Sequence, residues 1–250
     1  MTTVVVLADV PEENVLPALH PDPLSNSQAV SLYRAMLADV CETVQHGEAD
    51  LLVNYPTPER VAHDVDPEAA LRDVLDDELP ESESVRYEVQ VGETYAGRVG
   101  NALTHLLDVE DERTVGVVDP ATPLLGREHI GTVAMKLRTS DVVLGPSTDG
   151  RLYFAGFCEP VDFDDAFATP AVETMTGRAL DAGLSVDYLP QLPLVESPAD
   201  LATVVTLVRA RRAAGRIVPR RTAALFEEWE LEHTVDDVSR PTVSTASDNA

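Results

Sequence analysis

The sequence is almost without lysine. Its 250 residues contain one lysine, Lys136, and 18 basic residues in all, against 44 aspartates and glutamates, which gives a formal net charge of −26. Phosphate backbones are bound by clustered Lys and Arg side chains, so this composition predicts that nucleic acid is not a partner. Self-repulsion of this size is relieved by salt, which is the condition of halophilic proteins. We therefore predict adaptation to a salt-rich cytoplasm.

Cysteine, aromatic residues and long apolar segments are also scarce. Cys41 and Cys158 show no CxxC or Cys–His spacing, which indicates two buried thiols in a reducing compartment. Aromatic residues make up 5% of the chain, so Val, Leu and Ala must build the core. No segment approaches the ~18 unbroken apolar residues of a membrane span, and no basic region precedes the apolar start, as in a signal peptide. The chain is expected to be cytoplasmic, without a membrane span.

Apolar strands alternate with helices along most of the chain. Residues 3–8 are apolar at nearly every position, which is typical of a strand buried on both faces inside a sheet. Ser25 and Gln28 form a capping box for the next helix, which Gly47 ends. The same alternation predicts strands at 50–54, 85–91, 114–118, 141–144, 152–157 and 185–189, and helices at 67–75, 93–107 and 127–138, with later helix starts at Thr169-Pro170 and Ser197-Pro198.

This order of elements predicts an α/β fold with three layers, in which a mainly parallel sheet carries helices on both faces. Residues 1–233 are expected to form one domain. The arginines between residues 209 and 221 stand at helical spacing and are interpreted as a helix face rather than a site for an anionic partner. Residues 234–250 are polar and unpatterned, which predicts a disordered tail.

In an open parallel sheet, ligands bind beyond the carboxyl ends of the strands. Asp119 closes an apolar strand, where a carboxylate can hold a divalent cation against phosphate oxygens or cap the following turn. The strand near residues 141–144 is followed by Asp149-Gly150, whose local pattern favours a tight turn over a ligand. The sequence alone leaves both questions open.

Several motifs occur in the order found in one family. One of them is the segment from Gly116 to Leu124, a strand that ends in an aspartate and a proline. The others are Leu24-Ser25, Leu32 to Leu37, Gly97-Arg98, Asn101-Ala102, Asp141 to Pro146, Asp149-Gly150, Tyr153, Gly156, Thr169-Pro170 and Ser197 to Leu201. With these motifs, residues 4–204 resemble a bacterial and archaeal family of small GT-A-like nucleotide-diphospho-sugar transferases. That family includes the glycosyltransferases associated with arsenosugar biosynthesis and selenodomain proteins, and the acidic composition suggests a haloarchaeal member.

The resemblance implies transfer of a sugar from a nucleotide diphosphate sugar, assisted by Mg²⁺ or Mn²⁺, with small-molecule substrates as partners. The implied catalytic residues are Asp119 and Asp149. The implied metal ligands are these two carboxylates together with Glu196. The positions implied to contact the nucleotide are Arg98, Gly145, Gly150 and Arg151.

The loop after the first strand departs from the family pattern. Family members carry lysines and an arginine there, whereas alignment places Asp9, Pro17 and Leu19 at these positions. Carboxylates in this loop would repel a diphosphate by about 1 kcal/mol per close pair even in water. The departure predicts weak nucleotide binding, which Asp9→Lys with Leu19→Arg should strengthen. Arg151, at a position where glycine is common, is one candidate for restoring a positive charge.

Two alternatives to sugar transfer follow. A non-catalytic descendant would bind a small molecule or a protein partner, which the altered loop favours. Nucleotidyl transfer, as in the similar guanylyltransferases of deazaflavin-cofactor synthesis, would need the same basic loop.

Overall fold

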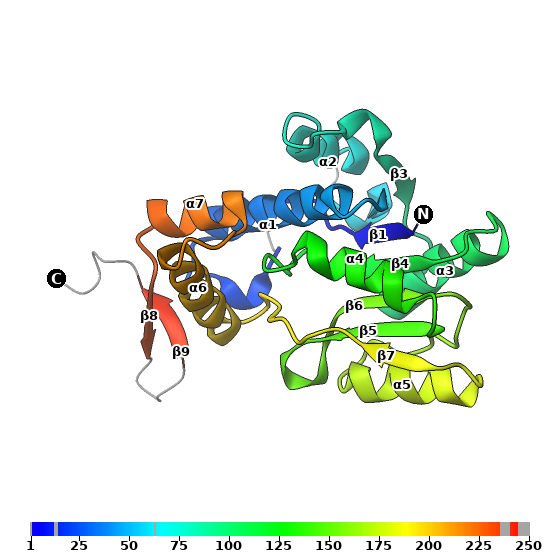
Figure 1. Ribbon diagram of the computed structural model, residues 1–250. Coiled ribbons are helices and arrows are strands. Elements are labelled where there is room, and N and C mark those ends of the chain that lie inside the picture. Colours follow the sequence, from blue (N-terminus) through cyan, green and yellow to red (C-terminus); the bar gives the residue numbers. More distant parts are fainter. Residues whose placement is uncertain (1, 13–14, 63, 236–240, 245–250) are drawn as a thin grey trace.

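The computed structural model describes residues 2–12, 15–62, 64–235 and 241–244. Its main sheet has the strand order β3-β2-β1-β4-β6-β5-β7 (Figure 1). The strands are β1 (Thr3–Leu7), β2 (Asp50–Tyr55), β3 (Arg86–Val89), β4 (Val115–Val118), β5 (Val142–Pro146), β6 (Leu152–Phe157) and β7 (Val186–Tyr188). β1 pairs in parallel with β2 on one side and β4 on the other, so the first strand lies inside the sheet, as predicted.

One strand of this sheet runs against the others. β6 is antiparallel to both β4 and β5, whereas the remaining pairs are parallel. Only residues 147–151 connect β5 to β6, and a parallel connection needs a crossover of a dozen or more residues. The short connection therefore forces a hairpin, and the prediction of a mainly parallel sheet is confirmed with this exception.

Helices cover both faces of the sheet, which confirms the three-layer prediction (Figure 1). Val4 and Val6 of β1 pack into a core with α1, α2 and α4, while Val5 and Leu7 pack into a second core with α3 and α5. Successive strand residues point to opposite faces, so an unbroken apolar strand supplies both cores. The helices are α1 (Asn26–His46), α2 (Pro67–Leu75), α3 (Tyr95–Asp108), α4 (Arg127–Lys136), α5 (Ala171–Asp181), α6 (Pro198–Ala213) and α7 (Arg220–Glu228).

The predicted helix starts are confirmed except for one. The Ser25–Gln28 capping box begins α1, and Ser197 caps α6 by accepting the Asp200 N–H. At the third start, α5 begins at Ala171, with Pro170 at the cap position and no side-chain hydrogen bond. Proline's fixed φ suits a helix entry without a polar cap.

The C-terminal part differs most from the sequence interpretation. The arginine-rich stretch is not one helix, because α6 ends at Ala213 and α7 begins only at Arg220, after Gly215 in the left-handed region (φ 65°). α7 lies beside α1 (Figure 1). Asp39 of α1 joins them: its carboxylate accepts the backbone N–H groups of Arg221 and Thr222.

Part of the predicted disordered tail forms strands. β8 (Glu232–Val235) and β9 (Pro241–Ser244) pair antiparallel, and Val243 is buried in the core that contains α6. A single buried valine in a polar segment is too weak a pattern to reveal such a hairpin. The other tail residues, 236–240 and 245–250, lie outside the described residues. In the part of the chain that the structure describes, no helix is long and apolar enough to cross a membrane.

The two cysteines are both free thiols. Cys41 is buried, whereas Cys158 is half-buried and donates its S–H to the Leu137 carbonyl at 3.3 Å. The prediction of two buried thiols therefore holds fully only for Cys41.

Candidate functional site

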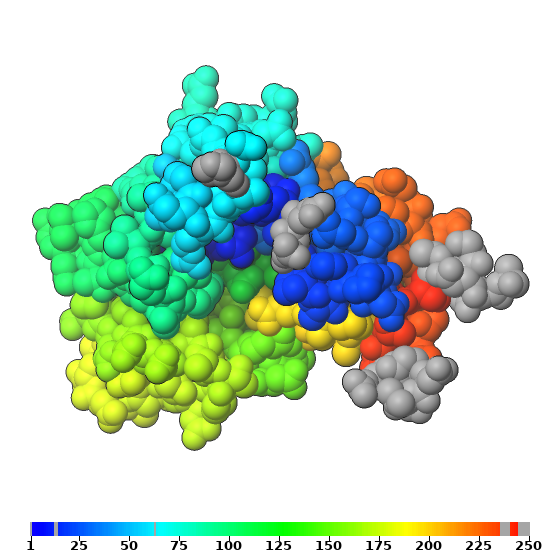
Figure 2. Space-filling view, turned by 180° about the vertical axis from the view of Figure 1, so that it is seen from behind, coloured from blue at the N-terminus to red at the C-terminus, as the bar shows by residue number. Residues whose placement is uncertain are grey.

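Two cavities meet at the carboxyl ends of the strands, where the fold predicts a ligand site. The first cavity, of about 520 Å³, lies between the loops that follow β1, β2 and β4. The second, of about 430 Å³, lies between the start of α3 and the segments around residues 151 and 165–169. Tyr95, Asp119 and Glu196 line both cavities. Figure 2 shows this face hollowed between the N-terminal segment, the residues around 60–95 and those near 190.

Asp119 lies where the two cavities join. Its backbone N–H continues the sheet by donating to the Tyr153 carbonyl, and its Oδ1 accepts the Ala121 N–H at 2.8 Å. Burial is the largest cause that raises the pKa of Asp119, and the negative charges of Glu196 and Asp9 add to it. Together they raise this pKa to about 7. Asp119 is therefore a turn cap, and it is also one of several carboxylates that repel one another in a partly desolvated site.

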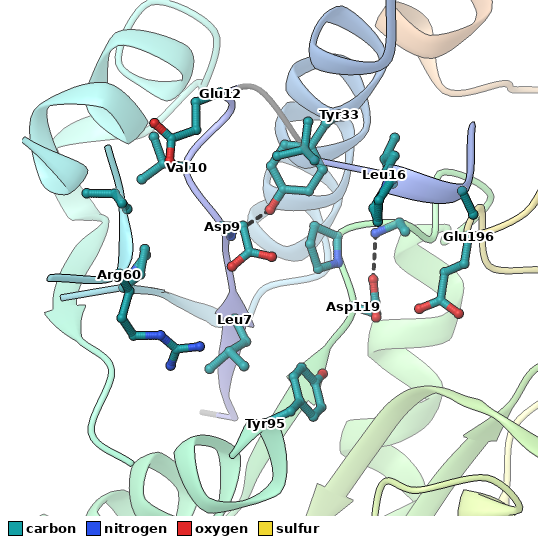
Figure 3. A pocket seen from close by; sticks show the side chains of 17 residues that line it. Leu7, Asp9, Val10, Glu12, Leu16, Tyr33, Arg60, Tyr95, Asp119 and Glu196 are labelled. Atoms are coloured by element: carbon teal, nitrogen blue, oxygen red, sulfur yellow. Dashed lines mark hydrogen bonds between the residues drawn. The ribbon is translucent and has the colours of Figure 1, made fainter. Parts of the chain in front are cut away.

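A divalent cation fits this charge distribution. Mg²⁺ is commonly held by one or two carboxylates together with substrate phosphates. Asp119 and Glu196 point into the same space (Figure 3), and a cation there would remove the repulsion that raises the Asp119 pKa. Among the described residues, however, no group of three His, Cys, Asp or Glu side chains is arranged to hold a metal. The donor set supports two protein ligands rather than the predicted three.

Asp149 is the predicted ligand that the structure places elsewhere. Its side chain is 86% exposed, lines neither cavity and lies 3.8 Å from Arg151. Asp149 is in the left-handed region (φ 56°) and Gly150 follows with φ 71°, so the pair forms the tight turn that local sequence favoured. This turn leaves the carboxylate exposed and outside both cavities.

The two predicted nucleotide-contacting glycines have packing roles. A Cβ on Gly145 would lie 2.6 Å from the Tyr153 ring, so glycine is needed where β5 meets β6. Gly150 serves the turn described above, and a Cβ there would contact Pro170 at 3.2 Å. Neither glycine lines either cavity.

Arg151 lines the second cavity but offers it no free donor. Its Nη1 donates to Glu196 at 2.6 Å and to Asp200 at 3.1 Å, and its Nη2 donates to Asp200 at 2.9 Å. Nη2 and Nε also donate to the hydroxyl and the carbonyl of Thr148. A guanidinium has five N–H groups, and all five have partners. Arg151 therefore does not replace the positive charge missing from the first loop.

Arg98 lies behind the first cavity rather than in its wall. The side chain is buried, its Nη1 donates to the Glu93 carbonyl, and its Nε has no partner. Desolvation in the cavity raises the pKa of Asp9, and the positive charges of Arg98 and Arg60 oppose that rise. Arg98 was predicted to face the nucleotide cleft, but it lines neither cavity. Its effect on the first cavity comes from its positive charge near Asp9.

The alignment of the first loop is corrected at Leu19. This side chain is completely buried, because the 3-10 turn at Pro17–Leu19 directs it into the core with Leu24. Pro17 and Ala18 line the first cavity instead. An arginine at position 19 would therefore bury a charge, and Leu19→Arg is not a way to restore the loop.

Three further cavity residues were not identified from the sequence. Tyr95 and Arg60 line the first cavity, as does Tyr33, whose hydroxyl accepts the Asp9 N–H at 2.7 Å. Arg60 follows β2, so the rule that ligands bind at strand carboxyl ends could have found it. Tyr33 lies among the buried residues of α1, where an aromatic ring is expected as part of the core, and its hydroxyl gives no separate signal in the sequence.

Comparison with known proteins shows the fold. Neither family models nor curated proteins match the sequence. A crystal structure of a candidate nucleotide-diphospho-sugar transferase from Desulfovibrio desulfuricans G20 superposes with a TM-score of 0.73 at 22% identity, covering 91% of this chain and 94% of that one. A cytidylyltransferase from Leptospira borgpetersenii serovar Hardjo-bovis (strain JB197) gives 0.50 at 6% identity, with the same coverage. The chain therefore has the GT-A-like fold of nucleotide-diphospho-sugar transferases.

Proposed function

We propose that the protein transfers a sugar from a nucleotide diphosphate sugar, with the nucleotide in the first cavity and the acceptor in the second. The observation that carries this proposal is the position of Asp119 and Glu196, which line both cavities at their junction. A group transferred between two bound molecules must pass such a junction. The fold shared with a candidate nucleotide-diphospho-sugar transferase is consistent with this arrangement.

The first cavity combines an apolar wall with a charged end. Leu7, Val10, Leu16 and Val61 offer apolar surface that suits a flat base, while Asp9, Arg60 and Asp119 supply the charges. Asp119 and Glu196 are the residues that would hold Mg²⁺ or Mn²⁺. When bound, such a cation supplies positive charge that stabilises a diphosphate as it leaves.

The second cavity suits a hydroxyl-bearing acceptor. Phe167 packs edge-on against Tyr95, with ring centroids 5.4 Å apart, and both rings line the cavity. Thr94, Asp165 and Thr169 add polar groups to the same wall. Aromatic surface beside a few polar groups is the usual composition of a small-molecule site.

The test is product analysis. The protein is incubated with a panel of nucleotide diphosphate sugars and Mn²⁺ in molar KCl, and release of nucleoside diphosphate is measured. Asp119→Asn should lower the rate about 100-fold or more, as for loss of a group that stabilises transition-state charge. Asp149→Asn should keep the rate, because Asp149 lines neither cavity and asparagine accepts its left-handed backbone.

The two alternatives give different products. Release of pyrophosphate from a nucleoside triphosphate and a sugar phosphate would identify a nucleotidyltransferase. A protein that binds nucleotide sugars but releases neither product would be the non-catalytic descendant.

We also propose that the protein works in the salt-rich cytoplasm of a halophilic, archaeal cell. The net charge of −26 supports this setting, because a salt-rich medium screens the repulsion that it causes.

A further inference from the structure

We propose that Arg60 binds the phosphate groups of the ligand in the first cavity and takes the place of the missing basic loop. This inference rests on the proposed function and deepens it by naming the residue that recognises the anionic part of the substrate. The residue comes from the loop after β2 rather than the loop after β1, so it lies outside the region that the family pattern indicates.

The placement of Arg60 suits this role. Arg60 is the last residue of a short 3-10 turn (Pro58–Arg60). Its side chain lines the first cavity and extends toward Leu7 and Asp9 (Figure 3). It makes no hydrogen bond or ion pair with any residue that the structure describes. Arg151, by contrast, has a partner for every donor. Arg60 is thus the lining arginine of the first cavity with free donors, and a guanidinium can bind a phosphate through two parallel hydrogen bonds.

Glu12 holds the Arg60 loop at the cavity. Its Oε1 accepts the N–H of Ala62, two residues after Arg60, at 3.3 Å. Glu12 therefore connects the loop after β1 to the loop after β2. Carboxylates of this loop were expected to repel a diphosphate, and the contact of Glu12 makes it in addition a positioning residue for Arg60.

Arg98 adds a second positive charge behind the same wall. It is more than nine-tenths buried, its Nε has no partner, and both Arg98 and Arg60 act electrostatically on Asp9. The two guanidinium groups offset the negative charges of Asp9 and Glu12 at this end of the cavity. An incoming phosphate is therefore bound by the free donors of Arg60, while Asp9 opposes it.

The experiment measures the affinity for inorganic pyrophosphate and for CDP, GDP and UDP by calorimetry, in one KCl buffer. Arg60→Ala should weaken pyrophosphate binding about 10- to 100-fold, the worth of one or two charge-assisted hydrogen bonds. Arg60→Lys should recover part of the loss, because it restores the charge without the planar fork. Glu12→Ala, which removes the acceptor of the Ala62 N–H, should weaken binding less than Arg60→Ala. Asp9→Asn should strengthen it, which a purely structural role of Asp9 would not do.

Arg138→Ala is the matched control. Arg138 is exposed and precedes β5, so it lies at the amino end of the strands, opposite the cavities, and its replacement removes the same charge. Affinity in this variant should change less than twofold. Unfolding temperatures of all variants are measured alongside, and Arg60→Ala should match the wild type because its side chain has no partner to lose.

The outcomes separate this inference from the proposed function. Equal pyrophosphate affinity in the wild type and Arg60→Ala, or an equal loss in Arg138→Ala, overturns the role of Arg60 and leaves the transferase proposal standing. Pyrophosphate binding that depends on Arg60, without binding of any nucleotide, supports the anion site and contradicts the nucleotide substrate. A wild type that binds neither contradicts both.

Discussion

Arg151 donates a 2.6 Å hydrogen bond to Glu196, and it simultaneously forms a bidentate pair with Asp200. This guanidinium fixes Glu196 at the junction of the two cavities, beside Asp119. All five donors of Arg151 are used within the protein, so this arginine organises the acidic side of the site.

Removing this guanidinium should destabilise the protein. Asp200 is buried, and Arg151→Ala would leave its carboxylate with only the Ser197 and Thr148 hydroxyls and a long backbone contact. Breaking a buried ion pair costs about 3–5 kcal/mol, and the lower end applies because Arg151 is partly exposed. Denaturation in molar KCl measures the loss. The double variant with Asp200→Asn should lose less than the sum of the single changes, and simple additivity would contradict the pairing.

Asp119 should make stability depend on pH. Its pKa is about 7 in the folded state and 3.8 for an ordinary aspartate, so between these values the folded state binds the additional proton. Stability contributed by this proton is present below about pH 4, falls as the pH rises toward 7, and is absent above it. The stability difference between Asp119→Asn and the wild type should therefore grow over this range and then level off. A flat difference curve from pH 4 to 8 would contradict the raised pKa.

Asp39 should be essential for docking of α7. Its two oxygens accept the Arg221 and Thr222 N–H groups, the Thr222 hydroxyl and the Arg221 guanidinium. Asp39→Ala removes the acceptor of the two N–H groups and the Thr222 hydroxyl, whereas the Arg221 guanidinium keeps Glu42 and Glu78, and the loss should be about 3 kcal/mol. The matched control is Asp73→Ala, because Asp73 is mostly exposed in its pair with Arg34 and should contribute less than about 1 kcal/mol. Equal losses in the two variants would show that α7 is held by apolar packing alone.

Salt should protect the fold. At a net charge of −26 the native state repels itself, and screening shortens the Debye length from about 10 Å at 0.1 M to about 3 Å at 1 M. We expect the unfolding temperature to rise between 0.1 M and 2 M KCl. An unchanged unfolding temperature would remove the case for halophilic adaptation.

The layers of the fold could be predicted from the sequence because they depend on local periodicity. The buried strand at Thr3–Leu7 and the capped start of α1 are both visible in short windows. The direction of β6 could not be predicted from its own composition, since an apolar strand reads the same in either direction. The break before Arg220 and the β8–β9 pair depend on tertiary contacts with α1 and α6, which local pattern does not record.

Two of the three expected carboxylates, Asp119 and Glu196, line the cavities, and their role as metal ligands stays a prediction. Asp149 was expected from family motifs, but its backbone conformation turns the side chain outward. Arg60 could not be found from the loop after the first strand, because it reaches the cavity from the next strand of the sheet. Gapless alignment failed at Leu19, because a 3-10 turn decides which side chains of that loop face the cavity.

The most direct measurement is the unfolding temperature in the presence of nucleotide diphosphate sugars, with and without Mn²⁺, for the wild type, Asp119→Asn and Asp149→Asn. A ligand at 100 times its dissociation constant adds about 2.7 kcal/mol of stability. We predict that at least one nucleotide sugar with Mn²⁺ stabilises the wild type and Asp149→Asn, and that Asp119→Asn abolishes the metal-dependent part. No stabilisation by any nucleotide sugar, or one that Asp119→Asn leaves intact, would contradict a metal-assisted transferase site between the two cavities.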